Sequence, residues 1–82
     1  MVELRETVEM MNSADYKERF KAEYYQLDAR IYKLTGMVSN YEMGTLDFEP
    51  SCPLDLLLAQ LDAMKIYAYT LRERAKIEGI EL

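Results

Sequence analysis

Several residue types that carry common chemistry are scarce or absent in this sequence. It contains no histidine, and Cys52 is its single cysteine. Without histidine the chain lacks the most frequent general base and metal ligand, and one cysteine excludes both an internal disulfide and a cysteine-based zinc site. Glycine-rich phosphate loops, nucleophile elbows and spaced metal motifs are also missing. We therefore expect no enzyme, no catalytic residues, no cofactor and no metal site.

Glycine, proline and long apolar runs are scarce as well. Three glycines and two prolines among 82 residues, half of which are hydrophobic, argue against disorder. No run approaches the roughly 20 apolar residues that a membrane-spanning helix needs. The first residues are charged and lack the apolar core of a signal peptide. The sequence therefore predicts a single cytoplasmic domain over residues 1–82 that does not contact membranes.

Positive charge is missing from the middle of the chain. Between Leu34 and Met64 there are five acids and no lysine or arginine. The whole net charge of −5 therefore lies in this segment, and an acidic protein is poorly suited to non-specific nucleic-acid binding. We expect no direct DNA binding. The acids of the segment are Glu42, Asp47, Glu49, Asp55 and Asp62.

Apolar residues recur with the three-and-four spacing of a coiled coil in two long stretches. The first contains Phe20, Tyr24, Leu27, Ile31, Leu34, Val38 and Tyr41, and the second contains Leu54, Leu57, Leu61, Met64, Ala68, Leu71 and Ala75. A ten-residue stretch with glycine and two prolines separates them. The pattern predicts an all-α fold, an antiparallel two-helix hairpin. Because a hairpin of this size buries little surface, we also expect association between chains.

The helix boundaries follow from capping residues. We expect a short N-terminal helix over residues 1–12, a long helix over 13–43, a loop over 44–53 and a second long helix over 53–79. Asn12 or Ser13 would cap the first long helix, and Ser51 or Cys52 the second. Glycines at 44 and 79 would end the two helices in the left-handed conformation. The sequence leaves open whether residues 1–12 pack on the hairpin or reach a neighbouring chain.

Apolar side chains outside the two stretches would remain exposed on a monomeric hairpin. They are Leu56, Ile66, Tyr67, Tyr69 and Ile77, all in the second helix. Clustered exposed apolar groups usually mark an interface, so this surface predicts a homo-oligomer contact.

Cations and tyrosines gather where the two open helix ends meet. Arginine can pair a phosphate and tyrosine can stack on a base, so the combination favours a nucleotide ligand. The candidate ligand-binding residues are Tyr16, Arg19, Tyr25, Tyr32, Lys33, Arg72 and Arg74. Two other interpretations stay open. The cations would form a solvated face paired with nearby glutamates, or the tyrosines would belong to a dimer interface.

Three segments of the chain resemble small helical proteins encoded by phages and prophages of gut bacteria, a group related to a crAss-like-phage protein. The segments are 15–27, 44–53 and 74–82. The resemblance implies a viral protein in the cytoplasm of an infected bacterium. Such small proteins often counter host defence, and some helical hairpins among them sequester nucleotide second messengers as oligomers.

Three hypotheses about function follow. The leading hypothesis is a non-enzymatic phage antagonist of bacterial immunity, a homo-oligomeric sponge for a small, cyclic or modified nucleotide. The alternative is a protein–protein inhibitor or adaptor whose acidic loop end binds a basic host defence protein through Asp47, Phe48 and Glu49. The third hypothesis is a structural component of the phage particle, for which the protein would need only to self-associate.

Overall fold

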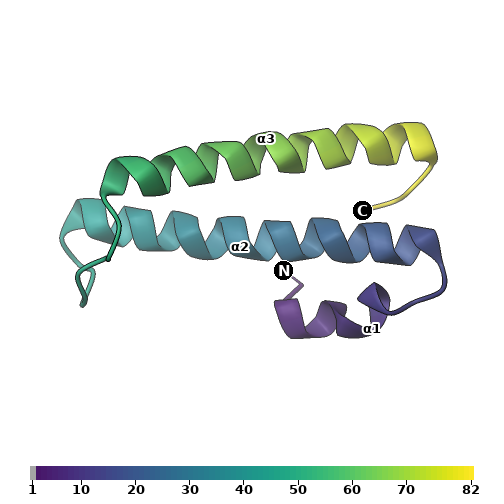
Figure 1. The fold of residues 1–82 in the computed structure, drawn as a ribbon, viewed down its shortest axis with the longest axis horizontal. Coiled ribbons are helices and arrows are strands. Elements are labelled where there is room, and N and C mark those ends of the chain that lie inside the picture. The colour runs from purple at the N-terminus through teal and green to yellow at the C-terminus, as the bar shows by residue number, and fades with distance from the viewer. Residues whose placement is uncertain (1) are drawn as a thin grey trace.

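Two long helices and a short N-terminal segment make up the fold. The structure is a computed structural model that describes residues 2–82. The elements are η1 (Leu4–Thr7), α1 (Val8–Met11), α2 (Tyr16–Met43) and α3 (Leu54–Glu78). Helices α2 and α3 run antiparallel side by side, while η1 and α1 lie along the other side of α2 (Figure 1). The predicted all-α hairpin is therefore confirmed.

Both long helices begin later than predicted, and each has a different capping residue from the predicted one. Helix α2 begins at Tyr16, and its cap is Asp15, whose carboxylate accepts a hydrogen bond from the Lys17 amide at 3.0 Å. The Ser13 hydroxyl instead accepts from the Asp15 amide, also at 3.0 Å, which keeps residues 13–14 in the preceding turn. Helix α3 begins at Leu54 after Pro53, which has no side-chain acceptor to offer. The predictions that Asn12 or Ser13, and Ser51 or Cys52, act as caps are thus wrong.

Both long helices end at a glycine in the left-handed conformation, as predicted. Gly44 has φ 72° and Gly79 has φ 71°, values that cost a residue with a Cβ atom about 1–2 kcal/mol. After each glycine the next amide donates back into the helix. Thr45 donates to the Asn40 carbonyl and Ile80 to the Ala75 carbonyl, each at 2.8 Å. The chain therefore reverses sharply at both ends of the hairpin.

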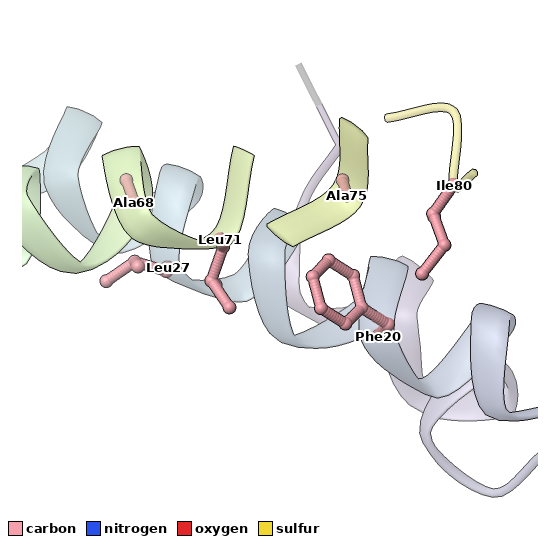
Figure 2. Packing of buried hydrophobic residues seen from close by; sticks show 6 residues of the cluster. All are labelled: Phe20, Leu27, Ala68, Leu71, Ala75 and Ile80. Atoms are coloured by element: carbon pink, nitrogen blue, oxygen red, sulfur yellow. The ribbon is translucent and has the colours of Figure 1, made fainter. Parts of the chain in front are cut away.

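The core lies between α2 and α3, and its main buried cluster lies towards the open end of the hairpin. Its buried cluster consists of Phe20, Leu27, Ala68, Leu71, Ala75 and Ile80 (Figure 2). The predicted apolar stretches form this seam, except that Tyr41, near the loop, is 40% exposed. Ile80 follows α3 and turns back onto Phe20, a contact that the spacing of apolar residues does not predict.

The N-terminal segment packs on the hairpin instead of leaving it. Thr7 is fully buried, and its hydroxyl donates to the Leu4 carbonyl at 2.6 Å and accepts from the Gln26 side-chain amide at 3.0 Å. Ala22 and Ala29 are buried on the same helix as Gln26. Their small side chains let the segment approach α2 closely. One side of α2 is therefore covered by α3 and the opposite side, at the open end, by η1 and α1.

Candidate functional site

The open end of the hairpin brings together cations and aromatic rings from both long helices, but not as one cluster. Arg72 and Arg74 are two positions apart in α3, which separates their side chains by about 200° around the helix axis. They therefore flank the seam on opposite sides. Each meets a different tyrosine of α2, and the two sides differ in charge balance.

Arg74 is held in a closed network. Its Nη2 donates to the Tyr16 hydroxyl at 3.0 Å, and its Nε pairs with the Glu78 carboxylate at 3.2 Å. The guanidinium carbon also lies 5.0 Å from the centre of the Phe20 ring. Tyr16 in turn donates to Glu78 at 2.8 Å, and this bond to a carboxylate raises the pKa of Tyr16 above its ordinary value. An anion approaching Arg74 would have to displace Glu78.

Arg72 has a neutral partner. Its Nη1 donates to the Tyr24 hydroxyl at 3.2 Å, and it pairs with no carboxylate among residues 2–82. Tyr24 contacts the neighbouring Tyr25 edge to face, with 6.0 Å between ring centres. The positive charge of Arg72 therefore remains available at the protein surface.

A hollow of about 200 Å³ lies beside Arg72. It is lined by Arg72, Ala75, Lys76, Ile80 and Leu82. Its floor is apolar and two cations stand at its rim. Lys76 pairs with Glu73 at 2.8 Å, and this hydrogen bond raises the pKa of Lys76. Because the side chains of Lys76 and Glu73 are 76% and 42% exposed, the pair contributes little and opens easily.

The other predicted ligand residues lie elsewhere. Arg19 donates to the Ser13 carbonyl at 2.8 Å and so holds the turn before α2. Tyr32 and Lys33 line a separate groove of about 340 Å³ with Glu3 and Ala29, where the N-terminal segment meets α2. The seven predicted residues therefore do not form one site.

Five residues of the Arg72 side were missing from the predicted site. They are Tyr24, Ala75, Lys76, Ile80 and Leu82. Tyr24 was assigned to the seam by its spacing, and its ring does pack there while its hydroxyl reaches the edge. The two tail residues reach the hollow only because the chain reverses at Gly79.

The loop end presents a different surface. Asp47, Phe48 and Glu49 line a shallow hollow of about 520 Å³ together with Tyr41, Gly44 and Leu46. Phe48 is 55% exposed, so its ring does not close the end of the hairpin. This surface combines an exposed aromatic ring with two carboxylates.

The predicted interface residues are all exposed on α3. They are Leu56, Ile66, Tyr67, Tyr69 and Ile77. Tyr67 is also occupied within its own chain, because its hydroxyl donates to the Glu23 carboxylate of α2. Leu56, Ile66 and Ile77 are aliphatic and remain exposed.

The described part of the chain offers neither a metal site nor a membrane-spanning helix. Within residues 2–82 no group of histidine, cysteine, aspartate or glutamate is arranged to hold a metal ion, and Cys52 is an exposed free thiol. No helix in this range has the length and apolarity that crossing a membrane requires.

Comparison with known proteins gives one family. No curated protein and no solved structure shows significant similarity to the chain. A family described as Sequestin matches residues 14–77, which span both long helices and the loop and make up more than three quarters of the sequence. The name denotes a sequestering protein rather than a catalyst. The chain belongs to the Sequestin family.

Proposed function

We propose that this protein is a phage-encoded antagonist of bacterial immunity that sequesters a nucleotide second messenger as a homo-oligomer in the host cytoplasm. Membership of the Sequestin family supports the sequestering role. The observation that carries the nucleotide part is Arg72, an exposed guanidinium with a neutral partner at the rim of an apolar hollow. Sequestration requires binding without chemistry, which suits a chain that has no histidine.

The chemistry of the Arg72 hollow fits a molecule with a phosphate and a flat apolar part. Arg72 would leave the Tyr24 hydroxyl and donate two parallel hydrogen bonds to phosphate oxygens, which are among the strongest in proteins. Lys76 would add a second positive charge after releasing Glu73. The ring or sugar of the ligand would lie on the floor formed by Ala75, Ile80 and Leu82.

Arg74 has a secondary role in this proposal. Its charge is already balanced by Glu78, and its guanidinium is fixed against Phe20. A phosphate would have to compete with that carboxylate, so binding at Arg74 gains less than binding at Arg72. The same argument places Arg19 outside the proposed site, because it holds the turn at Ser13.

Arg72→Gln is expected to weaken nucleotide binding by roughly 10-fold to 100-fold. This range corresponds to the loss of a charge-assisted hydrogen bond of about 1.5–3 kcal/mol. Isothermal titration calorimetry with a panel of linear and cyclic nucleotides measures the effect. Arg30→Gln is the matched control, since Arg30 is exposed on α2 and its side chain makes no hydrogen bond or ion pair within residues 2–82. Equal binding by both variants would refute the role of Arg72.

The second candidate function is a protein–protein inhibitor acting through the loop end. It is favoured by one observation, the exposed Phe48 ring between Asp47 and Glu49. Exposed charges of this kind steer a basic partner, and their attraction weakens with salt. Asp47→Lys with Glu49→Lys should abolish capture of a host defence protein while leaving nucleotide binding intact. Capture that is unchanged by the reversal and by salt would exclude this candidate.

A further inference from the structure

Helix α3 carries a second heptad stripe on the face opposite its buried seam. Its positions again alternate by three and four residues. They are Leu56, Ala59, Ala63, Ile66, Thr70, Glu73 and Ile77. All are exposed except Glu73, which is half-buried, and Ile66 and Ile77 are 68% and 87% exposed. A regular coiled-coil repeat has therefore no partner within residues 2–82.

The stripe has the shape of a helix-packing surface. Small side chains at Ala59, Ala63 and Thr70 lie between the larger Leu56, Ile66 and Ile77, and Glu73 is the one charged residue of the stripe. Small and large side chains together provide the holes and knobs through which two helices interlock. The stripe from 56 to 77 is roughly 33 Å long at 1.5 Å per residue, long enough for about three heptads of contact.

The two long helices differ in whether their outer faces are covered by another segment. The outer face of α2 is covered at the open end by the N-terminal segment, which packs over Ala22 and Ala29. The outer face of α3 carries no such segment anywhere in the described chain (Figure 1). An apolar stripe left open in this way is typical of an interface.

The distribution of charge along α3 favours a second copy of the same helix in the antiparallel direction. Asp55 and Asp62 flank the stripe in the N-terminal half of α3, whereas Arg74 and Lys76 flank it in the C-terminal half. Lys65 and Arg72 lie on another side of α3, away from the stripe. A second α3 running antiparallel would set the acidic half of each helix against the basic half of the other. A parallel copy would oppose like charges, which is unfavourable.

We infer that the protein forms a two-fold symmetric homodimer in which the α3 helices of two copies pack antiparallel through this stripe and cross near Ile66. Such an interface is self-complementary, because the same patch serves both copies. The inference rests on the homo-oligomer of the proposed function and specifies its geometry. It is tested without nucleotide, so either proposal can fail while the other stands.

The two basic ends then lie at opposite ends of the dimer. Each Arg72 hollow would lie outside the α3–α3 interface, because Arg72 faces Tyr24 of its own chain. Each dimer would thus offer two equivalent and separate hollows. Among the predicted interface residues, Leu56, Ile66 and Ile77 lie within the stripe, Tyr69 lies beside it, and Tyr67 faces Glu23 of its own chain.

Ile66→Asp tests the interface. The wild type is expected to sediment as a dimer in analytical ultracentrifugation, and the variant to raise the dissociation constant at least roughly 30-fold, as loss of a central hot spot does. Met43→Asp is the matched control, because Met43 is 65% exposed on α2 and lies outside the stripe. Far-UV circular dichroism verifies that both variants remain helical. A monomeric wild type, or an Ile66→Asp dimer as tight as the control, would overturn the inference.

Cysteine cross-linking tests the direction. In a Cys52→Ser background, Ile66→Cys lies near the two-fold axis and should form a disulfide between copies under mild oxidation. Ile77→Cys would lie far from its counterpart in the antiparallel dimer and should remain reduced. Efficient cross-linking at both positions would indicate a parallel pair and contradict the charge argument.

Discussion

Leu71→Ala is expected to lower the free energy of unfolding by about 2–5 kcal/mol. Leu71 is only 1% exposed and lies at the centre of the seam, so its removal leaves a cavity between the two helices (Figure 2). Chains of this length have a total stability of about 4–12 kcal/mol. The variant should therefore lose a large part of its stability, measured by urea denaturation followed by circular dichroism.

Leu58→Ala provides the control for this experiment. The substitution is the same and the helix is the same, but Leu58 is 38% exposed at the loop end. Truncating a partly exposed side chain should cost less than about 1 kcal/mol. Equal shifts of the urea midpoint for the two variants would contradict a core concentrated between Leu27 and Ile80.

Phe20→Ala is expected to cost about 3–5 kcal/mol, the second large effect. The ring is 3% exposed and fills the open end of the seam against Ile80. It also lies beneath the Arg74 guanidinium and meets the Tyr16 ring edge to face, with 6.2 Å between ring centres. Its removal should therefore loosen the Arg74 network as well as the core. Thermal unfolding measures the first effect, and the Tyr16 signals in an NMR spectrum report the second.

Two further variants separate these effects. Phe20→Leu restores apolar volume without an aromatic face, so it should recover most of the stability while the Arg74 contact stays weakened. Phe48→Ala, the matched truncation at an exposed site, should leave the melting temperature nearly unchanged. If Phe20→Ala had the same melting temperature as Phe48→Ala, the stability of the open end would not depend on the Phe20 ring.

The hairpin could be predicted because its causes are local and periodic. Spacing of apolar residues identified the seam, and Gly44 and Gly79 identified the helix ends. The burial of Ile80 was missed although a signal existed. The residue after a left-handed glycine commonly packs back on the helix, and Ile80 does so.

The candidate site was harder to predict because it depends on side-chain direction. Proximity of the helix ends grouped Arg72 with Arg74, whereas their angular separation on α3 places them on opposite sides of the seam. The N-terminal segment was unpredictable for another reason. Its buried residue is Thr7, a polar side chain satisfied by Leu4 and Gln26, while Val8 and Met11 remain half exposed. Apolar spacing cannot identify a contact of this kind.

Native mass spectrometry shows directly whether the protein sequesters a nucleotide. Spectra of the purified protein would be recorded alone and with a panel of linear and cyclic nucleotides. We expect a dimer that gains two ligand masses with a particular nucleotide and loses this ability in Arg72→Gln. A protein that keeps its unliganded mass with every nucleotide in the panel would contradict nucleotide sequestration, and a host-lysate capture through the loop end would then be the next experiment.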